Sequence, residues 1–277
     1  RRLDYDGANS TVVDFNESRV SLPEGLLKPV ELASVVPPGT QAIITPEHML
    51  ADNDVVEYRL SEYPVVPYTD RVLKADRVKR LEFFKCLGKK GILGVTSNPA
   101  CFVSPFFVAK KHDKQRLVLD CRMANHYFRR PPRPDLGPGE SISRLEVSPG
   151  VSETIYECEA DLRNCFYQIG IPSWLARFFA FNDHVSVDWC RSIQILTDLD
   201  GNPLQDGVVY YPALSVLPMG FSWSFWIVQD LVLGLCKEAG LGPDRILVAG
   251  WPAPDLSKGV VGNPYCDNLT LFSLDKK

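Results

Sequence analysis

Apolar and polar positions alternate over Cys158, Ala160 and Leu162, and this period of two predicts a strand. In residues 172–179 a proline and a serine precede bulky apolar side chains, which predicts the start of a packed helical turn. Asp161 would therefore lie at or near the end of a buried strand. An aspartate in such a place is as well explained as an N-cap or turn residue, so its role depends on a second group.

A helical period of apolar positions runs from residue 71 to about residue 87, behind the N-cap candidate Asp70 and before Gly88. The other face of this predicted helix is strongly basic. Such a face suits contact with phosphates, and a solvated helix face is the alternative interpretation of the same charges. The candidates for nucleic-acid contact here and just beyond are Lys74, Arg77, Lys89 and Lys90.

A hairpin is predicted next, with strands at residues 105–109 and 116–121 around a polar turn at 110–115. Its tip is cationic. Like charges that crowd one turn repel each other unless an anion neutralises them, and a polyphosphate is one such anion. The cations that crowd this turn are Lys110, Lys111, Lys114 and Arg116.

Four further segments complete the pattern. Residues 1–58 place turn signals between short β-prone runs, which predicts strands and loops of an upstream segment. Residues 182–213 alternate around a Gly-Asn-Pro turn, which predicts another hairpin. An apolar helix is predicted at 225–236, behind Gly220, where the backbone can approach a base or phosphate closely. Asp267 lies in a turn between β-prone residues.

Composition narrows the classes of protein. A chain of 277 residues with 45% apolar side chains can bury a sizeable core in one large or two smaller domains. The net charge of -4 argues against a uniformly basic nucleic-acid binder. Eight dispersed cysteines, without a Cys-x-x-Cys pair, suggest reduced thiols and no zinc site. We expect an intracellular protein, cytoplasmic or nuclear, that is not secreted, and the missing initiator Met suggests a piece of a longer chain.

Asp161 and Asp267 form a candidate pair of metal ligands. Brought together, two carboxylates could hold two divalent cations about 3.5 to 4 Å apart for in-line phosphoryl chemistry. Cations for a triphosphate, a glycine-containing loop and a two-metal site are the parts that a nucleotidyl transferase needs.

The order of these motifs resembles the fingers and palm of a retroelement (retrotransposon-type) reverse transcriptase over about residues 60–277. The residues that carry the resemblance are Asp161-Leu162-Arg163-Asn164-Cys165-Phe166, Leu217-Pro218-Met219-Gly220, Tyr265-Cys266-Asp267-Asn268 and the fingers hairpin within residues 104–125. Any one of these motifs is weak, whereas four in this order are specific.

The resemblance implies a function and roles. It implies RNA-directed DNA polymerase activity, with Asp161 and Asp267 as catalytic ligands of two Mg²⁺ ions, Mn²⁺ being an alternative. Lys111 and Arg116 would grip the triphosphate, and Phe166 would exclude a ribose 2′-hydroxyl. Met219, Gly220 and Tyr265 would be further substrate-binding residues. The implied partners are an RNA template, a DNA primer and a dNTP, with no membrane.

The implied fold is α+β, a right-hand polymerase with an antiparallel palm sheet flanked by helices and without a thumb. We expect an upstream segment at 1–58, fingers at 59–155, the first palm motif at 156–181, a fingers-type hairpin insertion at 182–213, and a truncated palm at 214–277. The thumb and RNase H regions would belong to a longer polyprotein.

Three departures from the family pattern keep an alternative open. Asn268 replaces a second aspartate, which would weaken a metal site, and Met219 stands where many members have glutamine. The chain also ends shortly after Asp267. The alternative is a catalytically impaired, nucleic-acid-binding relic. An RNA-dependent RNA polymerase is disfavoured, because the bulky Phe166 leaves little room for a 2′-hydroxyl.

Overall fold

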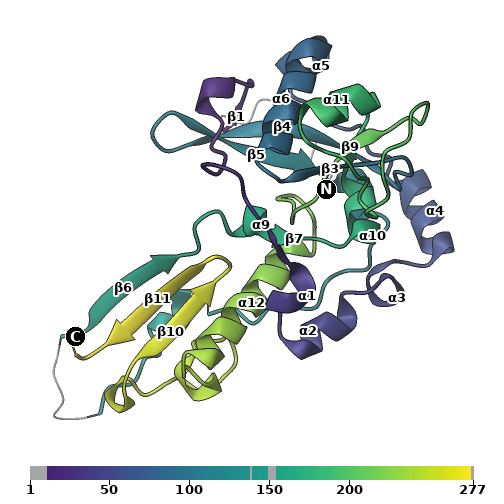
Figure 1. Cartoon of the computed structure of the whole chain (residues 1–277). Coiled ribbons are helices and arrows are strands. Elements are labelled where there is room, and N and C mark those ends of the chain that lie inside the picture. The colour runs from purple at the N-terminus through teal and green to yellow at the C-terminus, as the bar shows by residue number, and fades with distance from the viewer. Residues whose placement is uncertain (1–10, 138, 149–153, 276–277) are drawn as a thin grey trace. The chain divides into compact units, whose positions relative to one another are not determined.

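The computed structural model describes residues 11–137, 139–148 and 154–275, and it shows a mixed α+β fold (Figure 1). The predicted upstream segment, fingers and palm also include residues 1–10, 138, 149–153 and 276–277, which lie outside the described residues. The chain divides into two units. Unit 1 comprises Arg1–Ser34, Pro46–Arg130 and Phe166–Ser224, and unit 2 comprises Val35–Thr45, Pro131–Cys165 and Phe225–Lys277.

Unit 1 is built on a mixed six-stranded sheet in the order β1-β4-β8-β9-β3, with β5 paired to β4. Its strands are β1 (Val12–Val13), β3 (Leu93–Thr96), β4 (Phe102–Lys110), β5 (Lys114–Asp120), β8 (Ala180–Phe181) and β9 (Tyr211–Leu214). Only the β4–β8 pair of this sheet is parallel among the described strands. The predicted hairpin is confirmed as β4 and β5, whose last pair joins Lys110 to Lys114.

A second pairing in unit 1 ties distant segments together. The parallel pair is β2 (Val30–Glu31) with β7 (Ile169–Gly170). On β7, the carbonyl oxygen of Ile169 accepts a hydrogen bond from the Leu217 N–H at 2.9 Å, and the Ile171 N–H donates to the Ser215 carbonyl at 3.0 Å. The segment that leads into the Leu217–Gly220 loop is therefore held against the segment that follows Phe166.

The predicted helix at 71–87 is two helices, α5 (Arg71–Ala75) and α6 (Arg77–Lys89). Asp70 caps α5 as predicted, with its carboxylate accepting the Leu73 N–H at 2.9 Å. The prediction of one continuous helix is wrong, because the backbone of Asp76 is extended. The Asp76 carboxylate caps α6 by accepting hydrogen bonds from the N–H groups of Val78 and Lys79. An aspartate competes for backbone donors in this way and favours a helix start over a helix interior.

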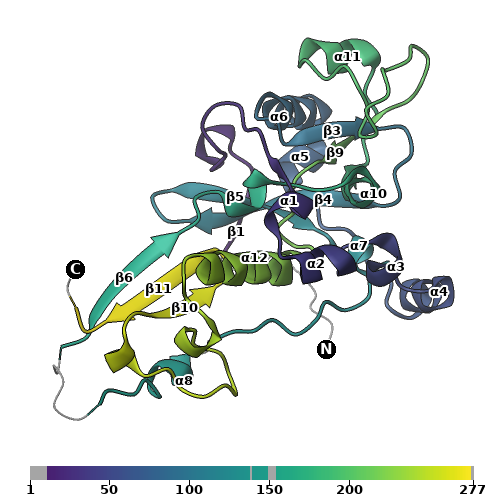
Figure 2. The same cartoon turned by 60° about the horizontal axis from the view of Figure 1, so that its bottom comes forward.

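The core of unit 1 is aromatic. Phe83 and Phe84 of α6 are buried, and the Phe84 ring stacks on that of Phe181 in β8 with centroids 4.6 Å apart. Phe83 meets Phe107 of β4 edge to face at 5.6 Å. The apolar side of α6 thus covers the sheet, as its periodicity predicts (Figure 2).

Most of the segment at 32–62 is helical, so the prediction of strands and loops up to residue 58 is wrong there. The helices of this segment are α1 (Leu32–Val35), α2 (Pro38–Ile43), α3 (Pro46–Met49) and α4 (Asn53–Glu62), and a short 3₁₀ helix, η1 (Glu17–Arg19), precedes them. Pro38 and Pro46 are turn signals by sequence, but each begins a helix. Proline is well tolerated in the first helical turn, because its missing N–H would be unpaired there in any case.

The hairpin prediction for residues 182–213 is only partly right. The alternating residues at its start form a helix, α11 (Val187–Ser192), which the Ser186 hydroxyl caps by accepting the Trp189 N–H at 3.1 Å. The later turn is confirmed, since the Asp198 N–H donates to the Asn202 carbonyl at 2.9 Å. Buried Val187 and Cys190 lie three positions apart, a spacing that places both on one face of a helix.

Short helical elements fill the connections of unit 1. They are α7 (Arg122–Asn125), α9 (Cys165–Gln168), α10 (Ser173–Ala176) and η2 (Arg177–Phe179), with α9 beginning at the last residue of unit 2. The helical turn predicted after Pro172 is confirmed by α10 and η2, whose Leu175, Phe178 and Phe179 are buried.

Unit 2 contains an antiparallel three-stranded sheet in the order β10-β11-β6, with a helix beside it. The elements are β6 (Tyr156–Asp161), α8 (Gly139–Ile142), α12 (Ser224–Glu238), η3 (Pro243–Arg245), η4 (Leu256–Lys258), β10 (Val261–Tyr265) and β11 (Asn268–Ser273). Figures 1 and 2 both show α12 running alongside β10 and β11. The strand at Asp161, the apolar helix and the strands around Asp267 are confirmed.

The predicted strand at 156–161 is not buried. All six residues of β6 are exposed, because β6 is an edge strand that pairs with β11 alone among the described strands. A period of two identifies an extended segment, whereas burial depends on what covers it.

The eight cysteines are free thiols, and six of them are buried. In the described part of the chain, no helix is both long and apolar enough to cross a bilayer.

Candidate functional site

Asp161 and Asp267 come together at one end of the unit 2 sheet. In the register of β6 and β11, Asp161 lies directly opposite Asn268. The Leu162 N–H then donates to the carbonyl oxygen of Asp267 at 2.8 Å. Opposite residues of an antiparallel pair have Cα atoms about 4.5 to 5.5 Å apart. Strand pairing therefore makes neighbours of Asp161 and Asp267, the two acidic residues that the sequence singled out.

The turn that carries Asp267 is tight. Tyr265 pairs with Asn268, so only Cys266 and Asp267 connect β10 to β11. Cys266 has a φ of 55°, in the left-handed region that two-residue hairpin turns require at their first position. A residue with a Cβ atom reaches that region at a cost, so other contacts must hold the turn.

Gln229 of α12 supplies those contacts. Its side chain is 1% exposed, and its Oε1 accepts a hydrogen bond from the Cys266 N–H at 2.7 Å. Its Nε2 donates to the carbonyl oxygens of Asp135 at 2.7 Å and Pro264 at 3.2 Å. These hydrogen bonds of Gln229 connect α12 to the turn that carries Asp267. This role of the Gln229 side chain has no local sequence signal.

Besides burial, the two carboxylates contribute to the raised pKa values of two nearby thiols, Cys165 and Cys266. Burial raises the pKa of Cys165 to about 12, and the charges of Asp267 and Asp161 add to the effect. Burial likewise raises the pKa of Cys266 to about 12, with Asp267 contributing. Both carboxylates therefore lie near the Cys165 thiol, and its raised pKa keeps that thiol protonated at neutral pH.

The donor set at this place consists of hard oxygen atoms. Asp161 is exposed and Asp267 is half-buried, so both carboxylates can reach an ion. The Asn268 amide nitrogen lies 3.4 Å from Asp267 Oδ1, so the amide oxygen is the third available donor. Within the described residues, no group of three or more His, Cys, Asp or Glu is arranged so that it could hold a metal ion. Mg²⁺ accepts such a set, because it commonly takes one or two carboxylates and completes its shell with water and phosphate oxygens.

The cationic hairpin tip lies in unit 1. Lys111 is in the turn between β4 and β5, where His112 and Asp113 adopt positive φ values of 60° and 55°. Asp113 forms an ion pair with Arg19 at 3.1 Å. Lys111 is exposed and forms no ion pair with any residue that the structure describes. The tip therefore carries an exposed cation, and its contact with a triphosphate stays a prediction.

Arg116 lies beside a buried tyrosine in the same unit. The hydroxyl of Tyr167 is buried and has no hydrogen-bond partner among the described residues. Burial raises its pKa, while the nearby Arg116 charge opposes the increase. The neighbouring Phe166, the predicted 2′-hydroxyl gate, is half-buried. Tyr167 was missed, because a tyrosine beside a phenylalanine gives no signal of an unpaired hydroxyl.

The loop at Leu217–Gly220 packs against β5. Gly220 has a φ of +116°, and a Cβ atom there would lie 2.2 Å from the Leu119 carbonyl oxygen. The Leu119 N–H donates to the Met219 carbonyl at 3.0 Å. The close approach at Gly220 is therefore to protein backbone, and the predicted approach to a base or phosphate stays a prediction. Asn125, which we did not predict, donates to the Gly220 carbonyl and accepts the Ser222 N–H.

The predicted nucleic-acid contacts are not equally available. Arg77 is engaged, since it lies 3.5 Å from the Asp183 carboxylate and donates to the His184 carbonyl at 3.0 Å. Lys89 and Lys90 lie at the C-terminal end of α6, where a cation also complements the helix dipole. Lys74 is exposed and forms no ion pair within the described residues. Tyr265, in unit 2, is exposed, and its ring contacts that of Phe225 at 5.6 Å.

Comparison with known proteins gives a distant relation. No protein-family model matches the chain. Over 149 residues it is 29% identical to the Gag-Pro-Pol polyprotein of Human T-cell leukemia virus 3 (strain Pyl43). The matched region is 54% of this chain and 9% of that polyprotein. The chain is therefore partially similar, at low identity, to a retroviral polyprotein.

Proposed function

We propose that this chain is a fragment of a retroelement polyprotein that performs template-directed nucleotidyl transfer, as an RNA-directed DNA polymerase. The observation that carries the proposal is the strand pairing that makes Asp161 and Asp267 neighbours. The four motifs in family order and the similarity to a Gag-Pro-Pol polyprotein, a class that includes a reverse transcriptase, support it.

The chemistry assigns a part to each group. Two bound Mg²⁺ ions, or Mn²⁺, would polarise the attacking primer 3′-hydroxyl and stabilise the leaving pyrophosphate. Asp161 and Asp267 hold these ions through carboxylate oxygens. Asn268 contributes at most a neutral oxygen, so it binds the ions less strongly than a second aspartate would.

Residues of unit 1 bind the nucleotide in this proposal. Lys111 and Arg116 neutralise the triphosphate of the incoming dNTP, since each is an exposed cation. Phe166 closes the space that a ribose 2′-hydroxyl needs. Met219 and Gly220 lie near the templating base pair, where the tight packing of Gly220 on β5 keeps that loop rigid.

Primer extension tests the proposal directly. The chain is incubated with an RNA template, a DNA primer, dNTPs and Mg²⁺ or Mn²⁺. We expect incorporation that falls to background in Asp161→Asn and Asp267→Asn. The matched control is Asp244→Asn, which removes an exposed carboxylate of unit 2 away from the pair. Equal incorporation by Asp161→Asn and the unmodified chain would refute the assignment.

A second function is favoured by one observation, namely that the described residues offer two carboxylates beside Asn268 at the site and no larger acidic group. In that case the chain binds nucleic acid without catalysis. It would then bind an RNA–DNA duplex in a salt-sensitive way, through Lys89 and Lys90 among others, and would incorporate no nucleotide with either metal.

A further inference from the structure

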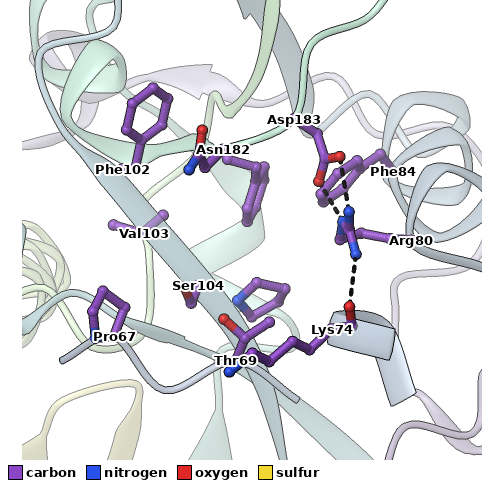
Figure 3. Close-up of a pocket in the computed structure, with 12 residues that line it drawn as sticks. Pro67, Thr69, Lys74, Arg80, Phe84, Phe102, Val103, Ser104, Asn182 and Asp183 are labelled. Carbon is purple, nitrogen blue, oxygen red and sulfur yellow. Dashed lines mark hydrogen bonds and ion pairs between the residues drawn. The ribbon is translucent and has the colours of Figure 1, made fainter. Parts of the chain in front are cut away.

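Unit 1 contains a cavity that none of the proposed catalytic residues lines. Its volume is about 310 Å³, which is within the range of small-molecule sites. It lies between the α5–α6 segment and strands β4 and β8 (Figure 3). Half of its twelve lining residues are apolar or aromatic, and half are polar or charged. The lining residues used below are Thr69, Lys74, Arg80, Ser104, Asn182 and Asp183, together with three phenylalanines.

The floor of the cavity is aromatic and rigid. Phe84 and Phe181 are 0% and 1% exposed and stack on each other, so the ring that the floor offers to a ligand is that of the half-buried Phe102. The Phe102 ring packs in turn on Tyr211 at 5.4 Å. A planar, largely apolar body is the shape that such a surface accepts.

One wall is a buried ion pair. Asp183 is 6% exposed, and its carboxylate accepts hydrogen bonds from Arg80 through both Nε and Nη2. Arg80 also donates to the carbonyl oxygens of Leu73 and Lys74, so its guanidinium is fully engaged (Figure 3). The Asp183 charge is thereby neutralised, and this wall repels neither anions nor cations strongly.

The rim, in contrast, has free polar groups. Within the described residues, the side chains of Thr69, Lys74, Ser104 and Asn182 form no hydrogen bond or ion pair. In Figure 3 the Lys74 side chain extends toward Thr69. Because Arg80 and Asp183 cancel, the Lys74 ammonium leaves the lining with one net positive charge. The cavity therefore combines an aromatic floor, an unpaired cation and three neutral hydrogen-bonding groups.

We propose that this cavity binds a nucleoside monophosphate, with the base on the aromatic floor and the phosphate at Lys74. The amide of Asn182 and the hydroxyls of Thr69 and Ser104 would pair with the polar edge of the base and with the sugar. A simple aromatic carboxylate would satisfy Lys74 and leave those three groups unused. An inorganic anion would leave the floor exposed.

This inference is independent of the proposed polymerase function. Its residues differ from the catalytic ones, and nucleotide binding here requires neither metal nor incorporation. Loss of activity in Asp161→Asn leaves the cavity unchanged, and failure of the cavity leaves the carboxylate pair unchanged.

The test is calorimetric titration of the full chain with AMP and UMP, without divalent metal, beside adenosine and inorganic phosphate. We expect the monophosphates to bind, and adenosine and phosphate to bind about tenfold more weakly or worse, since each lacks one half of the contact. Lys74→Gln should weaken AMP binding by about tenfold, the contribution of one charge-assisted hydrogen bond. Asn182→Ala should weaken it as well, and both positions are exposed, so folding is preserved.

The matched control is Lys79→Gln, which removes an exposed charge of α6 outside the cavity. An equal loss in Lys79→Gln and Lys74→Gln would show general electrostatic attraction and overturn the proposal. The proposal would also be overturned if AMP did not bind, or if AMP and inorganic phosphate bound with equal affinity. A 5′-phosphorylated dinucleotide separates two sources of the ligand: it displaces AMP if the cavity takes a strand terminus, and fails to if the cavity takes free nucleotides only.

Discussion

The side chain of Gln229 holds the backbone of Cys266, whose N–H donates to Gln229 Oε1 at 2.7 Å. This bond crosses from α12 to the hairpin turn and stabilises a residue with positive φ. Asp267 is the next residue. The orientation of a predicted metal ligand therefore depends on a buried amide that has no contact with the metal itself.

Gln229→Leu should destabilise unit 2. It leaves the Cys266 N–H and the carbonyls of Asp135 and Pro264 without their partner, and a buried unsatisfied group costs about 1 to 3 kcal/mol. We expect the free energy of unfolding, measured with urea, to fall by about that amount and Mg²⁺ affinity to fall with it. Gln205→Leu, an exposed glutamine, is the control. Unchanged stability in Gln229→Leu would show that the turn holds without the clamp.

Asn268→Asp should strengthen metal binding. The new carboxylate would lie opposite Asp161 in the strand register and add a negative charge where the donor set is weakest. Calorimetric titration with Mg²⁺ or Mn²⁺ should show tighter binding, and any incorporation should increase. Asn98→Asp places the same charge on an exposed site of unit 1 and should change neither. Equal Mg²⁺ affinity for Asn268→Asp and the unmodified chain would mean that position 268 does not face the ions.

Gly220→Ala should cost more stability than Gly201→Ala. Both glycines have positive φ, of +116° and +82°, so alanine is strained at each. Only at Gly220 would the added Cβ also meet the backbone, 2.2 Å from the Leu119 oxygen, whereas nothing lies within 4 Å at Gly201. We expect a difference of about 1 to 3 kcal/mol in thermal or urea unfolding. Equal losses of stability in the two variants would show that β5 shifts to accept the Cβ atom without a cost in free energy.

Asp120 should make stability depend on acid pH. Burial alone acts to raise its pKa, but hydrogen bonds from Arg122 and from the Tyr68 backbone outweigh burial, so the pKa lies below its ordinary value. A lowered pKa in the folded state stabilises the protein above the unfolded-state pKa of about 3.8. This stability is lost as pH falls through the folded-state value.

The measurement is the free energy of unfolding against pH for the unmodified chain and Asp120→Asn. The variant should be less stable near neutral pH, and its stability should decline less steeply below about pH 4. Asp188→Asn, an exposed carboxylate, serves as the control. Parallel curves for Asp120→Asn and the unmodified chain would contradict the predicted linkage.

Local patterns predicted the elements whose causes are local. The β4–β5 hairpin, the cap at Asp70, the apolar helix α12 and the turn at Asp267 are all present. Where neighbouring residues allow two conformations, the patterns misled. Alternation at 185–195 predicted strands where Val187–Ser192 is helical, and prolines at 38 and 46 begin helices.

The sequence by itself determined the types of residue that could form a site, namely Asp161, Asp267 and the cations of the hairpin, and the order of motifs that suggested a polymerase. Only the tertiary structure decided which of them meet. Pairing of β6 with β11 makes neighbours of Asp161 and Asp267. Gln229 stabilises the turn through a hydrogen bond, and Asp183 forms an ion pair with Arg77. The physical reason is that each contact joins segments far apart in the chain, so its energy depends on strand register and side-chain packing and leaves no trace in the local pattern.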